Sequence, residues 1–178
     1  RVALTGGMPE QVLSTPAPYA LYDATGKRLL YSDQKGYEME WRKHDNSSFA
    51  RDVWSWDVAA NEQTRLTDLG YDDRQPVWGA DRRSFYYLSE RSGTFNVWRM
   101  NIDDPRGAQQ VTDHKVHPVR FLSVSTGGDL CYTWDGALWI RPAGASASRR
   151  LDVQVATDRR VNQTDRIDVT AEISESAA

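Results

Sequence analysis

The sequence contains only one cysteine, Cys131, and no apolar run approaching the ~18 residues that a membrane-spanning helix needs. One cysteine forms no intrachain disulfide and no thiolate metal cluster by itself. Because its neighbours are Leu130 and Tyr132, we expect Cys131 to be a buried thiol in a strand. Basic residues are not in excess, because 22 Lys and Arg face 25 Asp and Glu and the net charge is −3. This balance argues against a general nucleic-acid-binding protein, which would present a basic face. We therefore expect no nucleic-acid partner and no membrane span.

Catalytic motifs are missing as well. The sequence has no G-x-S-x-G elbow, no phosphate-binding loop and no dinucleotide-binding glycine pattern. Its three histidines are His44, His114 and His117, and the last two lie in a turn without a carboxylate or cysteine at ligand spacing. A zinc site needs three or four convergent ligands, so we expect these two to be structural, packing on aromatic rings or satisfying turn backbone. The sequence predicts no catalytic residue, no metal site and no cofactor in this chain.

Aromatic residues, in contrast, are abundant, with seven Trp and eight Tyr. Residues 71–113 hold four short runs rich in aromatic and β-branched residues, separated by turns rich in Gly, Asp and Pro. Such runs are typical of strands, and four of them predict a small antiparallel sheet. The expected strands are centred on residues 76–78, 85–88, 96–100 and 109–112, and the expected turns are 79–81, 92–94 and 103–107.

The same unit recurs along the chain at a spacing of about 40–45 residues. Four strands repeated at this period are the signature of a β-propeller blade. The fold class predicted is therefore all-β, with about three blades of a probable six-bladed propeller. The recurring landmarks are Leu66-Thr67-Asp68 with Val111-Thr112-Asp113, Trp54 with Trp98, Trp98 with Trp139, and Pro76-Val77 with Pro118-Val119.

The repeat divides the chain into predicted blades at residues 6–69, 70–113 and 114–155. Residues 1–5 end in Leu4-Thr5 and are expected to be the last strand of a preceding blade. Residues 156–178 lose the pattern and are expected to be a linker towards a following domain. The chain is thus interpreted as a piece of a longer protein. Three blades cannot close a ring, so exposed edge strands predict an open arc that is poorly soluble as an isolated monomer or pairs with a second copy as a homo-oligomer.

The first blade carries a long insertion at residues 34–51, between its second and third strands. Loops longer than ~12–15 residues are usually functional or disordered. Tyr37, Met39, Trp41 and Phe49 lie in this insertion, which favours a packed excursion over disorder.

Three stretches carry a resemblance to known proteins: residues 36–54, residues 88–98 and His117-Pro118-Val119-Arg120-Phe121-Leu122-Ser123. The blades resemble the propeller repeats of TolB, the prolyl-oligopeptidase group and tricorn protease. The insertion and the His-Pro-Val-Arg-Phe stretch look most like the first, six-bladed propeller of tricorn-like serine proteases. This resemblance implies a non-catalytic segment that shapes access to a proteolytic chamber. Its implied partners are peptide substrates and the remaining blades and catalytic domains of a parent chain.

The resemblance also implies one pair of site residues, Arg42 and Lys43, inside the insertion. The tricorn-like family uses two basic residues there to hold the C-terminal carboxylate of a peptide, which arginine can grip with two hydrogen bonds. Lys43 stands where a second arginine is expected. The alternative is that Arg42 and Lys43 form a solvated charge cluster with Glu38 and Glu40.

Two other functions remain open. A TolB-like protein-binding propeller would have no protease attached, and a prolyl-oligopeptidase propeller would be followed by an α/β-hydrolase domain. The sequence does not give the compartment, although the resemblance favours the cytoplasm or periplasm of a bacterium or archaeon.

Overall fold

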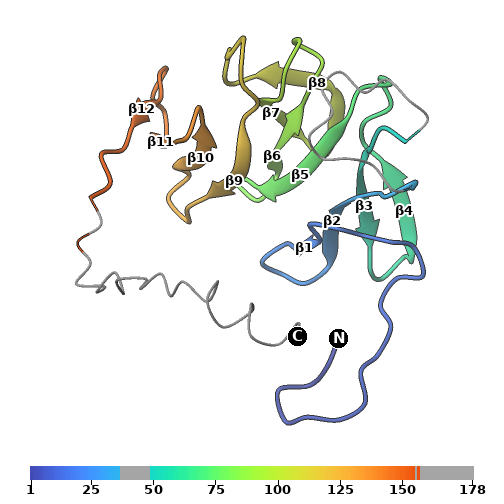
Figure 1. Ribbon diagram of the computed structural model, residues 1–178. Helices are drawn as coiled ribbons and strands as arrows, with labels where there is room; N and C mark the ends of the chain where they lie inside the picture. Colours follow the sequence, from blue (N-terminus) through green and yellow to red (C-terminus); the bar gives the residue numbers. More distant parts are fainter. Residues whose placement is uncertain (37–48, 155, 157–178) are drawn as a thin grey trace, which may run out of the picture.

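The computed structural model describes residues 1–36, 49–154 and 156, and within these ranges every regular element is a strand. Three four-stranded antiparallel sheets stand side by side in an arc, with the second sheet between the other two (Figure 1). The all-β propeller-blade prediction is thereby confirmed.

Blade 1 contains β1 (Leu21–Tyr22), β2 (Arg28–Ser32), β3 (Val53–Asp57) and β4 (Glu62–Arg65). Blade 2 contains β5 (Asp73–Trp78), β6 (Ser84–Ser89), β7 (Asn96–Asn101) and β8 (Asp104–Gln110). Blade 3 contains β9 (Arg120–Val124), β10 (Leu130–Trp134), β11 (Ala137–Arg141) and β12 (Arg149–Arg150).

Strands β1, β5 and β9 are the first strands of their blades, and β5 contacts both β1 and β9. We call them the inner strands. No helix in the described part of the chain is long and apolar enough to cross a membrane.

Blade 2 is buried on both faces, which explains the nearly continuous apolar run of β6. Phe85 and Tyr87 point to blade 1 and pack with Leu30 and Val53. Leu88, on the opposite face, packs in a separate apolar cluster with Leu130 and Tyr132 of blade 3. Because side chains alternate between the two faces of a strand, a strand covered on both sides shows no apolar–polar alternation.

In each of the first two blades, a threonine hydroxyl after the fourth strand accepts a backbone N–H of the third strand, and we describe this bond as closing the blade. Thr67 Oγ1 accepts the backbone N–H of Val53 at 2.9 Å, and Thr112 Oγ1 accepts that of Val97 at the same distance. In blade 3 the N–H of Leu151 reaches the carbonyl of Leu138 at 2.8 Å, as the residues before Thr67 and Thr112 do in their blades, but no threonine follows Leu151. These bonds confirm the predicted repeat of the Leu-Thr-Asp segment and of the tryptophans that follow Val53, Val97 and Leu138.

One predicted repeat is wrong. The N–H of Asp73 bonds to the carbonyl of Arg51, and the N–H of Val119 bonds to the carbonyl of Phe95, both at 2.9 Å. Val119 is therefore the equivalent of Asp73, at an offset of 46 residues. Pro76-Val77 and Pro118-Val119 do not correspond, because the two prolines lie at different heights along the inner strands.

Other expectations need local correction. Strand β8 begins at Asp104, so the turn lies at 102–103 instead of 103–107, and the register shifts between Arg99 and Asn101. Cys131 is free and only partly buried. Residues 1–5 form no strand. Residues 37–48, which include Arg42, Lys43 and His44, lie outside the described residues, as do 157–178 of the predicted linker.

Candidate functional site

A bulky residue in the left-handed backbone region lies inside β5, inside β9 and two positions before β1. These residues are Tyr19, Gln75 and Phe121, with φ of 58°, 51° and 54°. This conformation is uncommon outside glycine and costs roughly 1–2 kcal/mol. Register shifts mark β-bulges in β5 and β9 beside Gln75 and Phe121, and both residues stand two positions after the equivalent residues Asp73 and Val119. The three blades thus repeat one strained backbone position while changing the side chain on it.

The three residues line one pocket of about 80 Å³, which we call the axial pocket. Its rim is aromatic and accessible, since Phe121 is 70% and Tyr19 is 42% exposed. Gln75 Oε1 is buried there without a hydrogen-bond partner among the described residues. A buried acceptor of this kind needs a donor from water or a ligand. The remaining lining residues are Arg74, Leu88, Phe95, Val119 and Arg120.

Arg74 is fixed beside the axial pocket by two contacts. Its guanidinium pairs with the carboxylate of Asp72, and its Cζ lies 4.2 Å from the centre of the Phe95 ring. Asp72 is fully buried, and burial raises its pKa although Arg74 opposes that shift. The contacts hold the arginine rigidly, so it shapes the pocket wall.

Asp73, next to Asp72, is a buried carboxylate that the sequence did not reveal. Burial raises its pKa to about 6, against the opposing effects of the Ser89 hydroxyl, the Arg91 guanidinium and the Thr67 hydroxyl. The nearest cation, Arg91 Nη2, is 3.8 Å from Asp73 Oδ2. Two adjacent aspartates at the start of a strand are also typical of a turn, and no signal in the sequence pattern distinguishes the two cases.

The two junctions between blades differ in chemistry at equivalent positions. Arg51 and Asp73 meet where blades 1 and 2 join, whereas Phe95 and Val119 meet where blades 2 and 3 join. All four residues are buried. Nearby, the buried carboxylate of Asp52 is compensated by Lys35 Nζ at 2.5 Å and Arg65 Nη2 at 2.8 Å. The first junction is therefore a charged one and the second is apolar.

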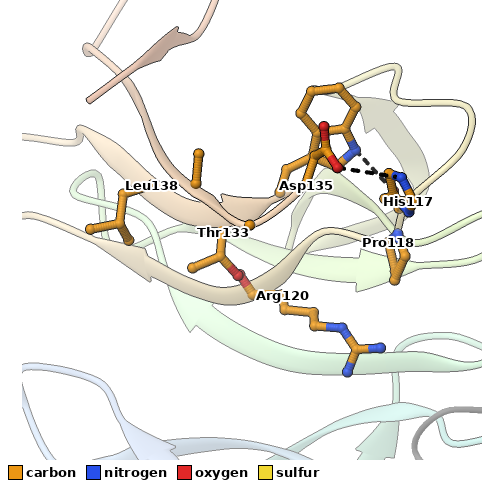
Figure 2. Close-up of a pocket in the computed structure, with 9 residues that line it drawn as sticks. His117, Pro118, Arg120, Thr133, Asp135 and Leu138 are labelled. Carbon is orange, nitrogen blue, oxygen red and sulfur yellow. Dashed lines mark hydrogen bonds and ion pairs between the residues drawn. The ribbon is translucent and has the colours of Figure 1, made fainter. Parts of the chain in front are cut away.

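A second pocket, of about 540 Å³, lies at the start of β9 and the β10–β11 hairpin (Figure 2). His117 Nε2 is 3.3 Å from Asp135 Oδ1, and the indole N–H of Trp134 donates to the His117 carbonyl at 3.0 Å. Thr133 Oγ1 lies in the same pocket but is directed to the carbonyl of Arg120 at 3.3 Å. A histidine paired with a carboxylate can orient a proton, yet acyl transfer also needs a nucleophile on the histidine. Among the described residues, no such nucleophile is in place.

His114 is structural, as the sequence predicted. Its ring stacks on Trp134 with centroids 4.1 Å apart, and the Asn96 amide bonds to both its backbone N–H and its carbonyl. Burial lowers the pKa of the His114 imidazole. Within residues 1–36, 49–154 and 156, no three His, Cys, Asp or Glu side chains are grouped to hold a metal ion.

Comparisons with known proteins support the fold. No protein-family profile matches the chain. An uncharacterized protein of Agrobacterium fabrum is 27% identical over 138 residues, which cover 72% of this chain and 44% of that protein. The structure of a putative TolB from Agrobacterium tumefaciens matches with a TM-score of 0.66 and 19% identity, over 82% of this chain and 53% of that one. The tricorn protease matches with a TM-score of 0.62 and 16% identity, over 80% of this chain and 14% of that one.

The chain thus spans about half the length of the first relatives that it matches. At such identities the likeness establishes a β-propeller of the kind found in TolB-like proteins and in peptidases. It does not single out the tricorn-like group that the sequence suggested.

Proposed function

We propose that the chain is a non-catalytic β-propeller segment that binds an extended peptide segment of a protein partner at the axial pocket. One observation carries this proposal: three equivalent strained positions, Tyr19, Gln75 and Phe121, line the same pocket. Backbone strain repeated at one place is a reason to look for function there.

The chemistry of the axial pocket suits a peptide. Backbone N–H groups of an extended chain are the donors that the unpartnered Gln75 Oε1 lacks. Tyr19 and Phe121 offer exposed aromatic surface to apolar side chains. The apolar floor, which includes Leu88 and Val119, favours a small apolar group at the bottom of the pocket.

Peptides selected from a displayed library on the wild-type chain would test this proposal. We expect Phe121→Asn to weaken their binding at least tenfold, because asparagine tolerates the left-handed backbone but removes the ring. Gln75→Leu should do the same by removing the acceptor. The matched control is Leu69→Asn, which removes another exposed apolar side chain outside the pocket. Binding that survives both pocket substitutions, or that Leu69→Asn weakens equally, would overturn the proposal.

A second candidate function is a propeller segment of a tricorn-like serine protease, and the match to the tricorn protease structure favours it. In this proposal Arg42 and Lys43 hold the C-terminal carboxylate of a peptide substrate. The test uses the full-length protein that contains this chain, with peptides that have free or amidated C-termini. An Arg42→Ala/Lys43→Ala double variant should lose hydrolysis of the free-carboxylate peptide selectively. Equal rates on both peptides before and after substitution would contradict the binding of the carboxylate by Arg42 and Lys43. No hydrolysis at all would contradict the assignment to a protease.

A further inference from the structure

A third pocket lies at the opposite end of the inner strands, where each of them turns back into the second strand of its blade. It has a volume of about 250 Å³, and we call it the hairpin pocket. The three hairpin turns β1–β2, β5–β6 and β9–β10 all contribute to it, and it shares no lining residue with the axial pocket. Its lining consists of Tyr22, Asp23, Ala24, Trp78, Gly79, Ala80, Arg82, Val124, Ser125 and Thr126.

Each of the three turns is held by its own side chain. Asp23 Oδ1 accepts the backbone N–H groups of Thr25, Lys27 and Arg28 at 3.0–3.3 Å. Asp81 Oδ1 accepts those of Arg83 and Ser84, and Ser125 Oγ accepts that of Asp129 at 3.0 Å. The walls of the pocket are therefore set before any ligand arrives, which lowers the entropic cost of binding.

Arg82 is the cation of the hairpin pocket. Its neighbours in space and sequence have carboxylate partners: Arg99 lies 2.8 Å from Asp81, and Arg83 lies 3.6 Å from Asp103. Arg82 is exposed at a φ of 57°, and no carboxylate among the described residues pairs with it. The carboxylate of Asp23, also in the lining, is occupied by the N–H groups of its own turn. Within the described part of the chain, the lining thus contains one cation without an ion-pair partner, beside a carboxylate whose hydrogen bonds all go to its own turn.

Apart from Arg82 and Asp23, the polar side chains of the hairpin pocket carry hydroxyls, which can donate as well as accept, and its walls are aromatic. The hydroxyls of Ser125 and Thr126 can donate, and Tyr22 is 44% exposed. The indole N–H of Trp78 donates to the Leu21 carbonyl at 3.0 Å, which fixes the ring as a wall. A guanidinium, two hydroxyls and aromatic faces together suit a carboxylate next to an aromatic side chain. The volume, roughly that of eight water molecules, is enough for one such side chain.

We propose that the hairpin pocket binds an acidic-aromatic segment of a protein partner, with the carboxylate on Arg82. This site is separate from the axial pocket, so the two proposals stand or fall independently. Because the charge is exposed to solvent, binding should weaken as salt is raised.

Two matched dipeptides test the inference by titration into the isotope-labelled chain, followed by proton–nitrogen NMR. N-acetyl-Phe-Asp-amide carries the carboxylate, and N-acetyl-Phe-Asn-amide is its uncharged isostere. We expect the aspartate peptide to shift the Trp78 indole and Ser125 amide signals and to bind at least fivefold more tightly. The preference should vanish in Arg82→Gln and persist in Arg82→Lys.

Arg83→Gln is the control, because Arg83 is the adjacent arginine, pairs with Asp103 and does not line the pocket. It should keep the full preference. Should Arg82→Gln disturb the turn, Arg82→Asn offers a neutral residue that accepts the left-handed backbone. Equal binding of the two dipeptides, no binding of either, or a preference that survives the loss of the Arg82 charge would overturn the inference.

Discussion

Asp73 is a carboxylate at a position where the next blade has Val119, and both side chains are fully buried. An ionised carboxylate that is buried without a close partner is costly. Burial at this position therefore favours the neutral, protonated form of Asp73. The charged side chains that face it are Arg91 and Asp52, which act in opposite directions on its pKa. Stability at this junction should therefore depend on pH.

We predict that Asp73→Asn flattens the pH dependence of the free energy of unfolding. The folded pKa of about 6 lies above the usual aspartate value of 3.8, so the protonated side chain favours folding below pH ~4 and this contribution is lost as the pH rises through 6. Between pH 4 and pH 7, the variant should gain on the wild type by up to about 3 kcal/mol. Urea unfolding at several pH values measures this difference. Parallel profiles for the two proteins would contradict it, and Asp68→Asn, at an exposed aspartate, serves as the control.

A second prediction concerns the threonine that closes blade 2. Thr112→Val keeps the shape of the side chain but leaves the buried N–H of Val97 without its acceptor, and it removes the bond to Asn96 Oδ1. We expect a loss of about 1–3 kcal/mol in the free energy of unfolding. Asp152→Ala, at the equivalent but exposed position of blade 3, should change stability by no more than about 0.5 kcal/mol. Comparable losses in both variants would show that the hydroxyl does not close the blade.

At the scale of the elements, the β5–β6 hairpin depends on one carboxylate. Burial would raise the pKa of Asp81, but hydrogen bonds from Ser84 and Arg83 outweigh it and hold the pKa at about 2. The stabilisation is therefore present above pH ~4 and is lost as the pH falls through 2.

We predict that Asp81→Ala destabilises the chain by about 1–2 kcal/mol at pH 7, since several donors of the turn lose their acceptor. The difference from the wild type should shrink between pH 4 and pH 2. Thermal unfolding across this range measures it. A deficit that stays constant with pH would mean that the ionised carboxylate is not what holds the hairpin.

The strands could be predicted from the sequence because their landmarks repeat. Thr67 and Thr112 each accept the same hydrogen bond in their blades. The repeat of threonine in the sequence therefore reflects a hydrogen bond that repeats in the structure. The axial pocket could not be predicted, because Tyr19, Gln75 and Phe121 share a backbone conformation but no residue type. Arg82 could not be predicted either, because the sequence of a polar turn does not show which of its arginines lacks a carboxylate partner in the fold.

At the scale of the whole molecule, blade 3 has one face that no described residue of another blade covers. Leu130 and Tyr132 pack towards blade 2, so Cys131 and Thr133 point the other way, opposite Ile140 and Leu138. Leu138 is 38% exposed on this face.

We predict that the 178-residue chain self-associates through this face. Its apparent mass by light scattering should rise with concentration, because an uncovered sheet face and its edge invite pairing. Leu138→Lys should suppress the rise, whereas Leu69→Lys, at another exposed leucine, should not. A wild-type chain that stays monomeric at every concentration would contradict the prediction.

Each sheet is completed by its own third and fourth strands, and the segments between sheets contribute no strand to either neighbour. A cut after the exposed Lys115 would therefore sever the chain without breaking a ladder. The two fragments would remain joined by the apolar contacts of Phe95 and Leu88 with Val119 and Tyr132. This connection is accordingly a natural place to introduce new termini, to split the protein into two reassembling halves, or to insert a reporter.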